Sequence, residues 1–412
     1  MARRRKRKGC LRRLLAVAIL LAAAAAVVAY LRPDLPVPAP SFSEGAPAAV
    51  QHAASETDTR FDPEFRPAYA ALSSDGQAAY RQLVNAILTD QARVDLDVEL
   101  GEAEVQAVVT AIRADQPELF WLGDGQVWSR DGVVESVEFT FTATGDELAR
   151  QRVELDERAE AITAGLAGRP VAEQEQAVLE AIAGAVTYDP TAPDAGQTAY
   201  NALVQGRAVC GGYARAFQLL MNQLGVPCYY VSGQGEGGAE NSSGDWGSHA
   251  WNLVKTDQGW YAVDPTWMQA DLFGSAGLSY RWFNGTEAGF SATHRRGSES
   301  APLPGTASAE YPLEEALGAT GPVLTLESAG FSVEGTVSTV PEYTDLVVRS
   351  VSEGRTRAVF VATGDLASRL ADARQTAANA AAQRLGRDLS LKAQTIQYDD
   401  NTLLVVEDYS AE

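Results

Sequence analysis

The spacing of apolar residues predicts two helices and a hairpin early in the chain. Residues 73–88 and 101–112 repeat apolar side chains at helical intervals, and Ser73 or Ser74 could cap the first of these helices. Between residues 120 and 143, apolar and polar side chains alternate instead, which is typical of paired strands. We therefore predict an α+β lead-in domain over residues 61–165.

The central part of the chain, residues 166–300, predicts helices first and strands afterwards. One helix is expected over 171–186. A second helix follows Cys210 and ends at Gly225, because a glycine closely followed by a proline is a stop signal. Short strands are expected to start at residues 228, 249 and 259, with a turn at 257–259 between the last two. This order is typical of an α+β core.

The end of the chain predicts a third folded region. Residues 301–318 are rich in Pro, Gly, Ala and Ser and predict a linker. A small α+β domain is expected over 319–412. Its predicted elements are strands at 346–351 and 358–362, an alanine-rich helix over 365–385, and a hairpin that turns at 399–401. Nothing in this region suggests chemistry.

The N-terminus predicts a membrane anchor. A basic tail over residues 1–13 precedes an uncharged run over 14–31, which is 18 residues long and close to the minimum for a transmembrane helix. Positive charge stays on the cytoplasmic side, so we expect a single-pass protein of the cell membrane with its body outside. A cleaved signal peptide is the alternative. Residues 32–60 predict a flexible stalk.

The charge of the chain excludes one class of partner. Beyond residue 32 the chain carries 24 basic and 54 acidic residues, a net charge of −30. This charge repels phosphate backbones, so nucleic-acid binding is not expected, whereas cationic partners are attracted. The three histidines are scattered and the three cysteines form no metal-binding pattern, so we expect no metal and no cofactor.

Cys210 is the first candidate for chemistry. It lies in the run GRAVCGGYARAF, directly before the apolar pattern of a helix. The free N–H groups of a helix N-terminus favour a thiolate. Gly211 and Gly212 have no Cβ, so a substrate can approach closely, and their amides, with that of Cys210, could face a developing oxyanion. The alternative is a buried cysteine of the core.

His249 and Asp264 are the next candidates, because they stand at the outer ends of two strands that share a turn. His249 begins the strand HAWN, and Asp264 ends the strand GWYAVD. An aspartate can hold one ring nitrogen of a histidine while the other nitrogen faces a thiol. Taken singly, His249 could be a structural histidine and Asp264 a turn residue before Pro265. Together with Cys210 they indicate a catalytic triad.

Three blocks of sequence resemble the core of the transglutaminase-like superfamily. They are AYNALVQGRAVCGGYARAFQLLMNQLGVPCYYVSG, HAWNLVK and GWYAVDPTW, within residues 170–270. The resemblance implies a papain-like α+β fold with Cys210 as nucleophile, His249 as general base and Asp264 as the carboxylate that orients it. It also implies acyl transfer through a thioester.

The chain departs from the animal transglutaminases in one respect. They use a tryptophan well upstream of the cysteine as an oxyanion donor, and this chain has no tryptophan between Trp128 and Trp246. Tyr188 and Gln205 are candidates for the second donor, and Trp246 could line the cleft. We expect the glycine-rich segment 233–248 to form a mobile flap over the cleft.

Two further residues receive structural interpretations. We interpret Cys228, at the start of a strand, as a small core residue, and His294 as part of a surface loop.

The predicted function is thiol-dependent acyl transfer on peptide or amide bonds outside the cell. Hydrolysis and transamidation share this chemistry and differ in whether water or an amine accepts the acyl group. We favour hydrolysis, because transamidation needs a site closed to water. Substrates are expected among peptides and proteins of the cell surface, cell-wall peptides included. The alternative is a non-catalytic adhesion or scaffold protein that retains the fold.

Overall fold

A computed structural model of the chain describes residues 59–191, 197–236 and 245–411. The predicted tail and anchor, and all but the last two residues of the predicted stalk, lie outside these ranges, so the anchor stays a prediction. Within the described ranges, no helix has both the length and the apolar character needed to cross a membrane.

The lead-in region combines helices with a small antiparallel sheet in the order β1-β3-β2. The predicted helices and hairpin are confirmed, and Ser73 Oγ caps α3 by accepting from the Gly76 N–H at 3.1 Å. The elements are η1 (Thr59–Phe61), α2 (Pro67–Ala70), α3 (Ser74–Leu88), β1 (Arg93–Asp95), α4 (Glu102–Asp115), β2 (Leu122–Arg130), β3 (Val133–Phe141) and α5 (Gly145–Thr163). Helix α5 was not predicted, because it is strongly charged and buries only a narrow stripe from Leu148 to Thr163.

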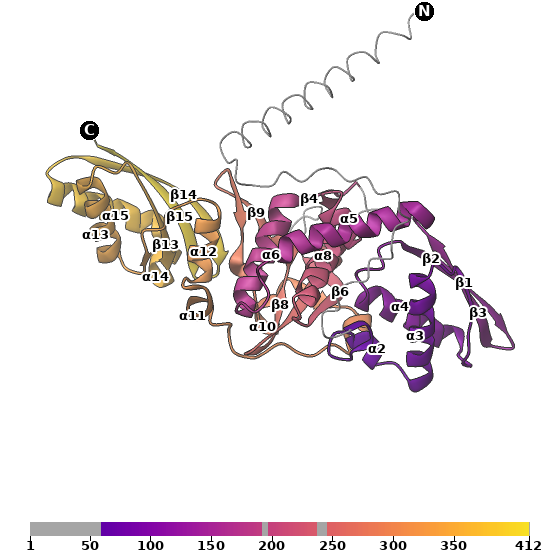
Figure 1. The fold of residues 1–412 in the computed structure, drawn as a ribbon. Coiled ribbons are helices and arrows are strands. Elements are labelled where there is room, and N and C mark those ends of the chain that lie inside the picture. Colours follow the sequence, from indigo (N-terminus) through magenta and orange to yellow (C-terminus); the bar gives the residue numbers. More distant parts are fainter. Residues whose placement is uncertain (1–58, 192–196, 237–244, 412) are drawn as a thin grey trace, which may run out of the picture. The chain divides into compact units, whose positions relative to one another are not determined.

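The central region is built on an antiparallel sheet in the order β11-β6-β7-β8. Helix α8 packs on β6 and β7 (Figure 1). The elements are α6 (Val171–Ala185), β4 (Thr187–Tyr188), α7 (Ala199–Leu203), β5 (Arg207–Ala208), α8 (Cys210–Gln223), β6 (Cys228–Glu236), β7 (Trp246–Thr256), β8 (Gly259–Val263), α9 (Pro265–Met268), β9 (Gln269–Leu272), β10 (Ser275–Leu278), η2 (Tyr280–Trp282), α10 (Glu287–Phe290), β11 (His294–Arg296) and η3 (Ser298–Ser300). The predicted turn is confirmed, since Thr256 pairs with Gly259.

One hydrophobic core joins the lead-in and central regions. Val108 and Ile112 of α4 are buried in the same cluster as Leu220 and Met221 of α8. The Gln218 side chain of α8 also donates to a carbonyl oxygen at the end of α4, at 2.9 Å. The lead-in and central regions, which were predicted as separate domains, therefore share a core. Helix α8 contacts both α4 and the central sheet.

The C-terminal region places helices on a four-stranded sheet in the order β12-β13-β15-β14. Helices α13 and α15 lie side by side (Figure 1). The elements are α11 (Leu313–Leu317), α12 (Gly321–Ser328), β12 (Thr336–Val337), α13 (Val340–Ser352), β13 (Arg357–Thr363), α14 (Gly364–Ser368), α15 (Leu370–Leu385), β14 (Leu389–Asp399) and β15 (Thr402–Ala411). The final hairpin is confirmed, and so is the alanine-rich helix, which is broken at Arg369.

The strand predicted at 346–351 is wrong, because these residues belong to α13. Thr339 and Glu342 form a capping box at the start of that helix. Tyr343, Leu346 and Val347 are then buried at helical spacing. The run of valines favoured a strand, but the cap and the packing of one helical face decide the structure.

Candidate active site

Cys210 is the first residue of α8, and Val209 before it has extended backbone angles. The helix is fixed to the central sheet by Asn252 of β7, whose side-chain amide donates to the Ala214 carbonyl oxygen at 3.0 Å. Both Cys210 and Cys228 are free thiols, and Cys228 is fully buried as predicted. Cys210 as a residue is partly exposed, so a substrate can approach it.

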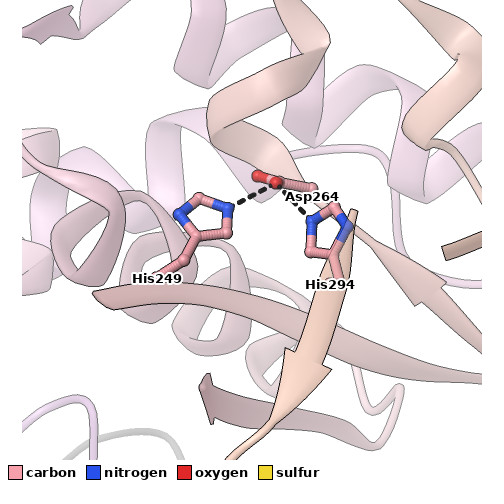
Figure 2. A group of neighbouring side chains, drawn as sticks. All are labelled: His249, Asp264 and His294. Carbon is pink, nitrogen blue, oxygen red and sulfur yellow. Dashed lines mark hydrogen bonds and ion pairs between the residues drawn. The ribbon is translucent and has the colours of Figure 1, made fainter. Parts of the chain in front are cut away.

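Strand register brings His249 and Asp264 together. Strands β7 and β8 pair from Thr256 and Gly259 at the turn as far as Asn252 and Val263. Asp264 directly follows β8, and His249 lies three residues beyond the last pair. The two side chains meet at that end of the hairpin, where His249 Nε2 lies 2.7 Å from Asp264 Oδ2 (Figure 2).

Hydrogen bonds surround the Asp264 carboxylate, which is fully buried. Its Oδ1 accepts from the backbone N–H groups of Thr266 and Trp267 at 2.9 and 3.0 Å, which caps α9. Its Oδ2 accepts from His249 and also from His294 Nε2, at 3.1 Å. Burial alone would raise the pKa of this carboxyl, but the two histidines outweigh burial and hold its pKa below the usual range.

His249 is oriented by the same contact. An ionised carboxylate only accepts hydrogen bonds, so Nε2 of His249 carries a proton. The other ring nitrogen, Nδ1, points away from Asp264 (Figure 2), and the Cys210 side chain lies close enough to His249 to raise its pKa. Burial tends to lower the pKa of His249, but Asp264 first and Cys210 second raise it to about 10. The surroundings therefore favour a protonated His249 ring beside the Asp264 carboxylate.

The prediction that His294 lies in a surface loop is wrong. His294 begins β11, an edge strand that pairs with β6, and its side chain is 1% exposed. Four aromatic rings enclose it, with centroid distances of 4.5 to 5.3 Å, from Trp251, Trp267, Trp282 and Phe290. The sequence around it, ATHRRG, is polar and gave no sign of a buried strand.

His249, Asp264 and His294 form a cluster of the kind that can hold a metal ion. Ligands of a tetrahedral zinc ion stand about 3.3 Å apart, given bonds of about 2.0–2.1 Å. The nitrogen–oxygen distances here are 2.7 and 3.1 Å, which is the spacing of hydrogen bonds. We therefore interpret the cluster as a hydrogen-bonded group.

Gly211 and Gly212, which were expected to donate to an oxyanion, have different surroundings in the structure. The Gly212 N–H donates to the Val209 carbonyl oxygen at 2.9 Å, so it is not free to bind an oxyanion as expected. A Cβ on Gly211 would lie 1.8 Å from the Gln197 side-chain oxygen, so this glycine admits the amide of Gln197. Gln197 is a neighbour of the Cys210 turn that the sequence did not indicate.

The other predicted site residues are Tyr188, Gln205 and Trp246. Tyr188 is in β4, which pairs with β5 just before Cys210. Gln205 is exposed and accepts a hydrogen bond from Asn201 at 2.8 Å. The Trp246 ring packs under the Arg295 guanidinium at 3.6 Å. None of these contacts involves Cys210.

The predicted flap over residues 233–248 is strand at both ends. Strand β6 continues to Glu236 and β7 starts at Trp246. Residues 237–244 lie outside the described ranges, so the mobility of the flap stays a prediction.

Two grooves lie beside α8. One, of about 720 Å³, runs between α4 and η3, and the other, of about 670 Å³, runs between α4, β2 and the two residues before α7. Arg215 and Tyr230 line both, and the Arg215 guanidinium stacks on the Tyr230 ring at 4.2 Å. Gln197, next to Gly211, lines the second groove. The grooves therefore reach the helix that begins with Cys210.

Residues 156–265 match the family described as the transglutaminase-like superfamily. No curated protein matches the chain. Among solved structures, the chain is similar to a TGase, with 18% identity, 42% of this chain and 50% of that chain covered, and a TM-score of 0.25.

Two further solved structures are similar. One is a protein from Cytophaga hutchinsonii provisionally described as a cysteine protease, with 15% identity, 35% and 61% covered, and a TM-score of 0.23. The other is the periplasmic domain of TgpA from Pseudomonas aeruginosa, with 22% identity, 35% and 62% covered, and a TM-score of 0.20. The chain thus spans 50 to 62% of the length of these three proteins. From the family match, residues 156–265 form a domain of the transglutaminase-like superfamily.

Proposed function

We propose that the chain is a thiol-dependent acyl-transfer enzyme that acts on peptide or amide bonds. The observation that supports this best is the buried Asp264 carboxylate, which accepts from His249 Nε2 and leaves Nδ1 for Cys210. Cys210 is the nucleophile, His249 is the general base and acid, and Asp264 holds the tautomer of His249.

The reaction has two halves. His249 Nδ1 takes the thiol proton of Cys210, and the sulfur attacks the carbonyl carbon while the C=O electron pair moves to oxygen. The tetrahedral adduct collapses, the C–N bond breaks, and the amine leaves with the proton that His249 returns. Water or a second amine then attacks the thioester, gives a proton to His249 and releases the acyl product, and Cys210 regains its proton.

Selective alkylation tests the nucleophile. Iodoacetamide at mildly acidic pH should label Cys210 about tenfold faster than Cys228, or more, because Cys210 is partly exposed and contacts His249. Cys228 is buried, and burial raises the pKa of its thiol. Mass mapping of the labelled peptides measures both rates in one sample. Urea-unfolded protein is the control, in which the two rates should converge. Equal rates in the folded protein would favour the non-catalytic scaffold.

The acceptor is tested by competition between water and an amine. We propose that water is the preferred acceptor, because Cys210 is a partly exposed residue and a thioester survives only where water is excluded. With candidate cell-surface peptides and an excess of a primary amine, we expect mainly the free acid in the product masses. A Cys210→Ala sample gives the background. Predominantly amine-conjugated product would make the activity that of a transglutaminase.

A further inference from the structure

We propose that His294 is a positioning residue for this reaction, which keeps Asp264 ionised and aimed at His249. The inference rests on the proposed function and extends it by one residue. His294 donates from Nε2 to the same carboxylate oxygen that His249 contacts (Figure 2). It would act through Asp264 and would not touch the substrate.

The register of the sheet explains how two histidines reach one carboxylate. His294 of β11 pairs with Gly235 of β6, and His249 of β7 pairs with Gly233. Paired residues share a face of the sheet, and so do residues two apart on one strand. Both imidazoles therefore stand on the same face, on the two strands that flank β6.

Glycines between the two histidines make room for their contact. The backbones of β7 and β11 are about 9.6 Å apart, since neighbouring strands lie about 4.8 Å apart. The ring centroids of His249 and His294 are nevertheless 5.5 Å apart, because the rings lean together over β6. A Cβ on Gly235 would lie 3.1 Å from the His249 ring. The glycines of β6 therefore leave room for the two imidazole rings to approach each other.

The bonds to Asp264 show what His294 contributes. A carboxylate offers about four lone-pair sites. Two are used by the backbone N–H groups of Thr266 and Trp267, one by His249 and one by His294. Without His294, a fully buried carboxylate loses one donor, and the anion is disfavoured. Asp264 would then take up a proton at higher pH or turn away from His249.

The surroundings of His294 keep its ring in place for this task. The four aromatic rings around it exclude water, and Thr293 Oγ1 lies 2.9 Å from Nδ1. Burial lowers the pKa of His294, so its neutral form is favoured. The titratable groups that face Asp264 are His249 and His294, and Cys210 lies behind His249. Nε2–H of His294 then serves as a fixed donor.

The test compares His294→Phe with His294→Gln in the full chain. Phe retains a ring of similar shape and removes the donor, whereas the Gln amide can restore an N–H near Nε2. With p-nitrophenyl acetate as the acyl donor, His294→Phe should lower kcat about ten- to a hundredfold with KM unchanged. The acidic limb of its rate–pH profile should move to higher pH. His294→Gln should recover most of kcat and return the limb towards the wild-type position.

A stability control separates positioning from general loosening. Leu83→Ala opens a cavity in α3, in the core of the lead-in region, and touches none of the rings around His294. It should lower Tm without moving the acidic limb. A His294→Phe enzyme with wild-type kcat and limb would overturn the proposal, and so would a Leu83→Ala enzyme whose limb shifts equally.

A measurement on the wild-type chain needs no variant to fold. In ¹⁵N-histidine-labelled protein at neutral pH, Nε2 of His294 should carry a proton and show a downfield N–H resonance. A lone-pair nitrogen at that position would overturn the proposal. This readout does not depend on turnover. A chain with no Cys210-dependent turnover but a protonated His294 Nε2 would contradict the acyl-transfer function and leave the contact with Asp264 in place.

Discussion

Replacement of Cys210 or His249 by alanine is expected to reduce turnover by about 10⁵- to 10⁶-fold, because members of a triad act as a unit. Cys210→Ala removes the only thiol that contacts His249 among the described residues. His249→Ala removes the proton acceptor and leaves the buried Asp264 with one donor fewer. The double variant should be no slower than either single variant. Steady-state rates on the same peptide or ester measure all three.

Cys228→Ala is the matched control for this prediction. It removes the second described thiol, which is fully buried in the core. We expect near-normal kcat with a lower Tm, since the change leaves a small cavity. Near-normal turnover in His249→Ala would remove His249 from the mechanism. Loss of activity in Cys228→Ala without loss of fold would mean that Cys210 is not the essential thiol.

The sequence predicts the parts of the site that depend on local signals. The start of α8 at Cys210 follows from the apolar spacing after it, and its end near Gly225 follows from the glycine and proline. The turn at 257–259 sets the register of β7 and β8, so His249 and Asp264 could be placed at one end of a hairpin. Each inference uses residues within about 16 positions of one another.

The parts that the sequence missed depend on contacts between distant segments. His294 meets Asp264 across 30 positions, and it does so from a three-residue edge strand without alternation. Gln197 meets Gly211 only because α7 packs beside α8. The shared core of α4 and α8 joins residues about a hundred positions apart. Neither periodicity nor capping signals carry this information, because each describes one element at a time.

Asp264→Asn is expected to lower kcat by about 10³- to 10⁴-fold with little change in KM, because the amide forces the wrong tautomer on His249. Backbone N–H groups determine the orientation of the new side-chain amide. Oδ1 of Asp264 accepts two backbone N–H groups, from Thr266 and Trp267, so the oxygen of Asn must stay there. The amide nitrogen then faces His249 and His294, and each Nε2 must become an acceptor. The proton of neutral His249 is then on Nδ1. Nδ1 therefore cannot accept the proton of the Cys210 thiol.

The same substitution has a signature in the pH dependence of stability. The pKa of Asp264 in the folded chain is held below its ordinary value of 3.8. The carboxylate therefore stabilises the fold above about pH 4, and this contribution is lost as the pH falls through the folded-state pKa. Asp264→Asn lacks the contribution at every pH. The difference in free energy of unfolding between wild type and variant should shrink from pH 5 towards pH 2 in denaturant titrations. A constant difference would mean that Asp264 is not an ionised partner of the two histidines, and a variant with normal kcat would exclude it from the triad.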